Sequence, residues 1–243
     1  MSTVPTFLTA LFADDASRLI AAGCFVLTVA LYFASKALYA RLRSPWVTPL
    51  VAVPVVLGAT VLLLHIPYPV YFEDTRWLMW LLGPATVAFA VPIYEYRDLL
   101  KRHWISLAVG VSVGIVAGVG GSLVLARLLH LSPDLQRSLM TRSVSTPFAL
   151  AVSDKIHAPR DLTALFVIAT GICGMLFGEV VLALVPLRTR LARGALFGAA
   201  AHGVGTAKAR ELGSEEGVVA SLTMMIAGVV MVLLAPALGF LPV

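Results

Sequence analysis

The feature that most constrains this chain is a series of long apolar runs separated by short polar loops. A helix needs roughly 20 apolar residues to cross the hydrocarbon core of a bilayer. Charged residues make up 13% of the chain, whereas a soluble domain carries about a quarter. The sequence therefore predicts an all-α integral membrane protein with about six full spans. The runs cover about residues 18–36, 47–66, 77–94, 104–129, 161–187 and 217–241.

The net charge of +5 comes from Lys and Arg residues that gather in the loops. This distribution is typical of the positive-inside rule and argues against a nucleic-acid-binding surface. The loop from His65 to Asp74 has no Lys or Arg, so we expect it outside, together with the N-terminus. Three basic loops are expected in the cytoplasm, and their residues are Lys36, Arg41 and Arg43, then Arg97, Lys101 and Arg102, then Arg188, Arg190 and Arg193.

Two segments, about 133–156 and 190–213, are too polar to be simple lipid-facing spans. The run 104–129 ends outside and the run 161–187 begins outside, so the first segment begins and ends on the outer side. We therefore expect a re-entrant hairpin, and the same argument favours a cytoplasmic hairpin for the second segment. In the alternative interpretation both segments are full broken crossings, which would place the last basic cluster outside, against the charge rule.

A faint internal repeat relates the two halves of this region. A shift of 57 residues superposes a span and the polar segment that follows it, in units of about 104–156 and 161–213. Inverted repeats that meet at the bilayer midplane are a common transporter plan. We treat residues 1–243 as a single polytopic membrane domain. The matched positions are Gly114-Ile115 with Gly171-Ile172, Gly121 with Gly178, Val124-Leu125 with Val181-Leu182, and Leu139 with Leu196.

The first polar segment has a proline in a polar stretch. Proline lacks an N–H and disfavours a helical conformation in the residue before it, so we expect a helix break. Freed backbone groups at membrane depth need protein or a water-filled cavity. The restarted helix would direct its positive end into the gap beside three hydroxyls and an arginine, which suits a carboxylate. The stretch is Arg142, Ser143, Val144, Ser145, Thr146 and Pro147.

The second polar segment runs from Ala201 to Lys208. Gly203 and Gly205 permit an unwound backbone with amides open to a ligand, and Thr206 can cap the helix that restarts. His202 can titrate near neutral pH and Lys208 adds a cation, and such groups at membrane depth are functional-site candidates.

Structural roles are the alternative in both segments. Small residues can serve helix packing, and hydroxyls can satisfy their own backbone. The charged ends of Arg142 and Lys208 can extend to an interface.

Two further residues have open roles. Pro84 interrupts the third apolar run and is either a third break that lines the same cavity or a harmless kink. Glu179 lies within the 161–187 run and is a proton-coupling candidate, a partner for a neighbouring cation, or an interfacial residue. Cys24 and Cys173 lie in apolar runs without metal-ligand neighbours, so we predict neither a metal site nor a cofactor.

Several ordered motifs resemble the LrgB/CidB family, from about residue 16 to the end of the chain. Arg142-Ser-Val-Ser-Thr-Pro-Phe-Ala is similar to the family element KSVTTPIA, with Arg for Lys and Ser for Thr. His202-Gly-Val-Gly-Thr-Ala is similar to SHAxGTA, with Ala201 for Ser. Leu82-Gly-Pro-Ala-Thr-Val-Ala-Phe-Ala-Val-Pro is similar to LxPAxVALAxPLY. Glu216-Gly217 and Ser221-Leu222 also fit.

The resemblance implies two functions. The first is transport of small monocarboxylates such as glycolate, glycerate or pyruvate, because the family includes the C-terminal domain of the plastid glycolate/glycerate transporter. The second is a holin-like regulation of murein hydrolases and autolysis with an LrgA/CidA-like membrane partner. It further implies a bacterial inner membrane location, proton or sodium coupling and a homodimer as candidates.

An enzyme is not expected. Ser and His residues occur, but the sequence has no GxSxG turn and no Asp placed to orient His202.

The substrate-binding candidates are Arg142, Ser143, Ser145, Thr146, Pro147, His202, Gly203, Gly205, Thr206 and Lys208. Proton-coupling candidates are His202 and Glu179, and Pro84 is a cavity-lining candidate.

Overall fold

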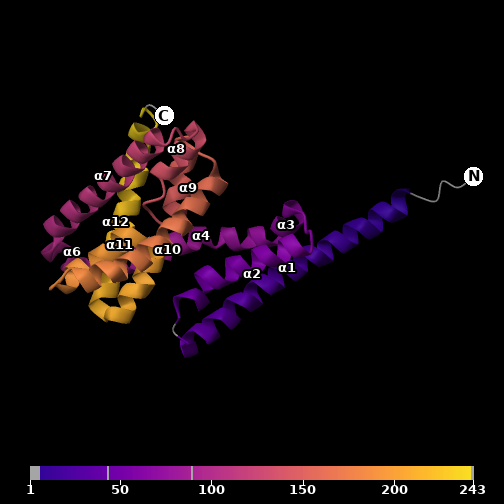
Figure 1. Ribbon diagram of the computed structural model, residues 1–243, viewed down its shortest axis with the longest axis horizontal. Helices are drawn as coiled ribbons and strands as arrows, with labels where there is room; N and C mark the ends of the chain where they lie inside the picture. The colour runs from indigo at the N-terminus through magenta and orange to yellow at the C-terminus, as the bar shows by residue number, and fades with distance from the viewer. Residues whose placement is uncertain (1–5, 43, 89, 242–243) are drawn as a thin grey trace, which may run out of the picture. The chain divides into compact units, whose positions relative to one another are not determined.

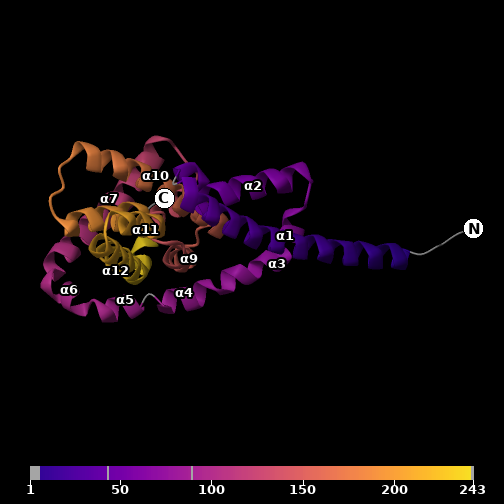
Figure 2. The same cartoon turned by 90° about the horizontal axis from the view of Figure 1, so that it is seen from below.

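The computed structural model describes residues 6–42, 44–88 and 90–241, and these ranges contain helices and loops but no strand. The chain forms two compact units, Met1–Pro84 and Ala85–Val243. Figures 1 and 2 show the helices of both units in two views. The all-helical prediction is confirmed, whereas the treatment of the chain as one domain stays a prediction.

The first unit is built on one long helix. Helix α1 (Thr6–Leu42) packs against α2 (Pro49–Leu63) and α3 (Tyr68–Trp80), and a short 3-10 helix, η1 (Pro45–Val47), precedes α2. Pro49 begins α2, where its missing N–H costs no hydrogen bond. Ser35 of α1 donates a 2.6 Å hydrogen bond to the carbonyl oxygen of Val47, which fastens the connection to the long helix.

The third apolar run is divided among several short helices. Helix α3 ends at Trp80, and α4 (Leu82–Ala88), α5 (Ala90–Glu95) and α6 (Arg97–Arg102) follow. The helix ends four residues before Pro84, as expected because a proline ring clashes with the carbonyl group four residues earlier. Pro84 is exposed and ends the first unit. Its assignment to a cavity stays a prediction.

The second unit contains three long helices with two shorter helices and one kinked helix between them. Helix α12 is the central one, because it packs against α7, α9 and α11 (Figures 1 and 2). Its apolar stretch is 61% buried, compared with 33% for α7 and 22% for α10. The elements are α7 (Trp104–Leu128), α8 (Pro133–Met140), α9 (Thr146–Lys155), α10 (Arg160–Leu184), α11 (Arg190–Leu212) and α12 (Ser214–Leu238).

Four helices of the described residues are long and apolar enough to cross a membrane. They are Ser17–Leu42 within α1, and α7, α10 and α12. The second predicted run forms the shorter apolar helix α2, of 15 residues.

Helices α8 and α9 form a first hairpin whose turn, residues 141–145, reaches the middle of two long helices. Helix α8 starts shortly after the end of α7, and α9 leads to the start of α10. The turn contacts the interior of both helices, because Ser143 lies against Gly118 and Arg142 donates a hydrogen bond to Thr170. The predicted break before Pro147 is therefore present in the structure.

Helix α11 is a second hairpin that reverses at His202, where the backbone has non-helical angles of φ 42° and ψ −122°. Phe197 packs against Gly178, yet Lys208, 11 residues later, reaches the next residue of α10, Glu179. A continuous helix would separate residues 197 and 208 by about 16 Å. The two halves, 190–201 and 203–212, therefore lie side by side.

The element bounds repeat with nearly the same offset as the sequence pattern. Helices α7 and α10 each have 25 residues and start 56 residues apart. The first hairpin spans 133–155 and the second 190–212, so both ends differ by 57 (190 − 133 and 212 − 155). The turns match as well, because Ser145 precedes α9 and His202, 57 residues later, is the kink.

Candidate functional site

The turn of the first hairpin presents a helix N-terminus and a buried hydroxyl. Ser145 is the N-cap residue of α9, with extended backbone angles, and Pro147 lies in the first turn, where proline is tolerated. The Ser145 side chain makes no capping hydrogen bond. The residue is 7% exposed, and its Oγ has no hydrogen-bond partner in the described part of the chain. Buried polar atoms without partners are rare, so this atom is a candidate ligand contact.

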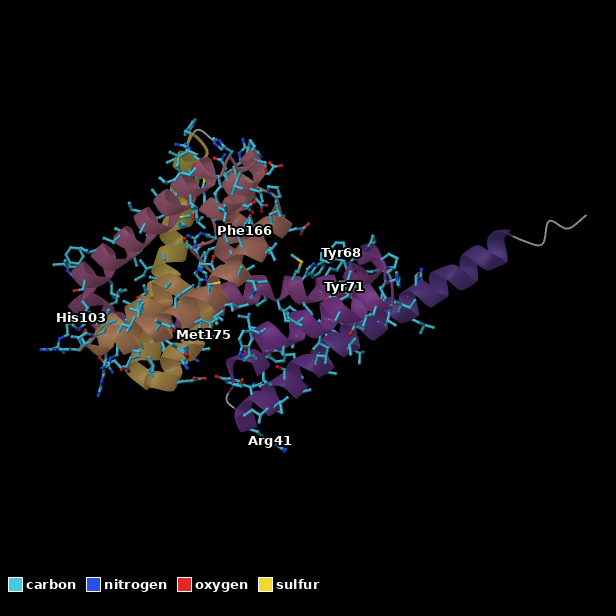
Figure 3. All side chains as sticks on the ribbon, viewed as in Figure 1. Arg41, Tyr68, Tyr71, His103, Phe166 and Met175 are labelled. Carbon is cyan, nitrogen blue, oxygen red and sulfur yellow. The ribbon has the colours of Figure 1, made fainter. Side chains whose placement is uncertain are left out.

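Arg142 projects from the same turn toward two long helices. Its Nε donates a 2.8 Å hydrogen bond to Ser122 Oγ of α7, and its Nη1 donates to Thr170 Oγ1 of α10 at 3.4 Å. Phe166 and Met175, labelled in Figure 3, lie on α10 about one turn before and after Thr170. The guanidinium group thus joins the middle of α7 to the middle of α10.

Arg142 is half-buried, yet its side-chain partners are neutral hydroxyls. Within the described ranges no carboxylate forms an ion pair with it. A charge that is partly removed from water is stabilised by a counter-ion. The arrangement is therefore suited to an external anion.

Ser143 and Gly118 bring the turn into close contact with α7. A Cβ added at Gly118 would overlap Ser143 Oγ. Thr146 and Pro147 form the first turn of α9 and are partly buried. A glycine at position 118 therefore allows the polar turn to approach the long helix.

His202 forms the turn of the second hairpin and meets the first. Its ring lies in hydrogen-bonding contact with the backbone of Arg142 and close to the guanidinium group. The residue is 2% exposed, and its Nε2 has no hydrogen-bond partner among the residues that the structure describes. A positive φ is uncommon outside glycine and costs about 1–3 kcal/mol. The backbone strain and the unpartnered nitrogen coincide at the place where the two turns touch.

The glycines of the second segment act differently from what their sequence suggests. No glycine in the described ranges has a positive φ, so the backbone unwinds at His202 and not at Gly203 or Gly205. A Cβ at Gly205 would overlap the carbonyl oxygen of Phe197, so this glycine permits the two halves to approach. Gly203 faces open space, and Thr206 Oγ1 donates a 2.8 Å hydrogen bond to its carbonyl oxygen.

Lys208 lies apart from the meeting point of the turns. Its Nζ forms ion pairs with Glu179 Oε1 at 2.5 Å and with Glu211 Oε2 at 3.3 Å. Glu179 is nine residues beyond Thr170 on α10, a separation of about 13 Å along a helix. The structure therefore brings together Arg142 and His202, and it places Lys208 with Glu179 at another level.

Ser122 and Thr170 complete the site, and the sequence analysis did not select them. Each is a single hydroxyl residue within a long apolar helix, a pattern that often reflects only a bond to the helix backbone. Ser122 does make such a bond, donating to the carbonyl oxygen of Gly118 at 2.5 Å. The 57-residue offset was the available signal, because it places Ser122 at the position of Glu179.

The second unit thus presents buried polar turns enclosed by long apolar helices, which defines a polytopic membrane protein with an interior cationic site. The chain belongs to the LrgB-like family, which matches residues 28–240. The predicted family resemblance is confirmed. The protein is an integral membrane protein, and the relatives described next are bacterial.

Three relatives illustrate the similarity. The uncharacterized protein YwbG of Bacillus subtilis (strain 168) is 38% identical over 86% of this chain and 93% of its own length. The uncharacterized protein YxaC of the same organism is 31% identical over 84% of this chain and 89% of its own. The holin-like protein CidB of Staphylococcus epidermidis is 27% identical over 88% and 93%. No solved structure matches the chain.

Proposed function

We propose that this protein transports small monocarboxylates of the glycolate, glycerate or pyruvate type across the membrane, without converting them chemically. The observation that supports this most is the half-buried Arg142, which has neutral hydroxyl partners at the meeting point of two helix turns. Ser145 Oγ and His202 Nε2 lie in these turns and lack partners within the described residues. An anion with a second polar group would supply what all three side chains lack.

The proposed binding mode follows from the chemistry of these groups. The carboxylate accepts hydrogen bonds from Arg142, Ser143 and the first backbone amides of α9, where the helix dipole favours negative charge. Ser145 and His202 bind the adjacent hydroxyl or oxo group. His202 also serves as the proton-coupling residue, and Glu179 is assigned to holding Lys208.

The proposed architecture is an inverted repeat in a membrane. About six spans, including α2 and the divided third run, would surround two re-entrant hairpins that enter from opposite sides. The equal offsets of the hairpin ends and turns support this plan. Movement of one repeat against the other would expose the site alternately to the two sides.

Uptake of labelled glycolate, glycerate and pyruvate into proteoliposomes tests the proposal. We expect saturable flux that is inhibited competitively among the three substrates and changes with a pH gradient. A parallel sodium gradient distinguishes the coupling ion. Absence of saturable flux across a panel of C2 to C4 carboxylates would show that the proposal is wrong.

A second candidate function is suggested by the name of a relative, the holin-like protein CidB. In this alternative the protein regulates murein hydrolases and autolysis together with an LrgA/CidA-like partner. Alanine substitutions at Ser145 and His202 separate the two functions. A regulator that acts through its partner surface keeps its lysis phenotype in both variants, whereas a phenotype that depends on carboxylate flux is lost with the flux.

A further inference from the structure

The two repeats place different residues beside the cations of their hairpins. Ser122 and Glu179 occupy equivalent positions, because 179 − 122 = 57, the offset of the hairpin ends. Ser122 accepts a 2.8 Å hydrogen bond from Arg142, and Glu179 pairs with Lys208 at 2.5 Å. The same position of the fold thus contacts a cation in both repeats, once through a hydroxyl and once through a carboxylate.

This difference determines which cation keeps an uncompensated charge. Glu179 neutralises Lys208, with Glu211 as a second carboxylate. Ser122 donates its own hydroxyl hydrogen to the carbonyl oxygen of Gly118, so its oxygen is free to accept from Arg142. The serine therefore fixes the direction of the guanidinium group and adds no negative charge.

We propose that Ser122 is a specificity-determining residue: it positions Arg142 and, by being neutral where the other repeat has Glu179, reserves the arginine charge for an anionic ligand. Thr170 supports the same arrangement from α10. The inference rests on the proposed function for the identity of the ligand, but the rule about charge depends only on these contacts.

Ser122→Glu is the variant that tests the rule, and Ser122→Gln is its matched control of nearly equal size. The glutamate would pair with Arg142 inside the protein, as Glu179 pairs with Lys208. The probes are glycolate and its neutral analogue glycolamide, measured as flux and as thermal stabilisation in detergent. We expect Ser122→Glu to weaken the glycolate response by about 10- to 100-fold, the range for hydrogen bonds to charged groups.

The preference for glycolate over glycolamide is the decisive quantity. Ser122→Gln changes the shape of the position but leaves Arg142 charged, so its preference should remain although its affinity falls. An equal loss of preference in both variants would overturn the proposal, because the effect would then be steric. Thr170→Glu brings a carboxylate to Arg142 from a different helix and should reproduce the loss.

The two readouts separate this inference from the transport function. Glycolate that stabilises the wild-type protein without flux, in a manner abolished by Ser122→Glu and kept by Ser122→Gln, would remove transport and keep the charge rule. Normal wild-type flux with no difference between the two variants would remove the rule and keep transport. If Ser122→Glu does not fold, as judged by its elution from size-exclusion chromatography, Thr170→Glu decides the result.

Discussion

The two hairpins meet at one point but turn in different ways. The first uses a turn of several residues, 141–145, with ordinary backbone angles at Ser145, whereas the second reverses at His202 with a positive φ. The first carries a cation held by hydroxyls, and the second carries a cation held by carboxylates. A shared plan has therefore been given a ligand-facing charge in one half and a structural charge in the other.

The largest expected effect separates the two cations. Arg142→Gln should weaken carboxylate binding and transport by about 10- to 100-fold, because a charged hydrogen-bond donor is lost from a half-buried site. Lys208→Gln should reduce flux several times less and lower the thermal stability, because it leaves Glu179 without its partner. Initial rates in proteoliposomes and unfolding temperatures in detergent measure both. A greater flux loss in Lys208→Gln would reverse the assignment of the two charges.

The next effect concerns how each hairpin packs on α12. A Cβ at Gly198 of the second hairpin would overlap the backbone of Ala220, and a Cβ at Gly228 would meet only the ring of Phe148 from the first hairpin. A side chain can rotate away, but a backbone cannot. Gly198→Ala should therefore cost about 2 kcal/mol of stability and Gly228→Ala about half as much.

Gly110→Ala is the control for this pair, because the position faces open space on α7. It should not destabilise the protein, since alanine is the better helix former. Unfolding temperatures compare all three variants. Equal losses at Gly198 and Gly228 would contradict a tighter backbone contact in the second hairpin.

A smaller effect tests the strained turn itself. His202→Gly should be more stable than His202→Ala by about 1 kcal/mol, because glycine adopts a positive φ without strain and both variants remove the imidazole. If position 202 were helical, alanine would be the more stable, so the order of the two unfolding temperatures decides. Ser145→Gly and Ser145→Ala form the parallel pair in the first hairpin, where glycine should give no such advantage.

The sequence could predict the membrane class and the two broken segments, because hydropathy and proline chemistry act locally. Pro147 marks one turn directly. It could not locate the other turn, because Gly203 and Gly205 suggest flexibility while the strain lies on the histidine before them. Glycine at 205 is required by its contact with Phe197, and such a contact is set by tertiary packing.

The partners of the cations were equally hidden from the sequence. Lys208 and Arg142 are similar as residues in polar segments, and only the fold shows that Glu179 faces the first and Ser122 the second. The internal repeat contained this relation, because the offset aligns these two partners. It could be recognised only after the hairpin bounds established that the offset is structural.

The smallest expected effect compares an ion pair of each hairpin. Asp154 and Arg160, 2.6 Å apart at the end of the first hairpin, are about half exposed, so Asp154→Asn should change stability by less than about 0.5 kcal/mol. Glu179→Gln should cost about 1 kcal/mol, because Lys208 is 23% exposed and is less screened by water. The Glu179 variant should also become less sensitive to salt than the wild type. Equal effects of the two substitutions would mean that the Lys208 pair is as solvated as a surface pair and does not fasten the second hairpin to α10.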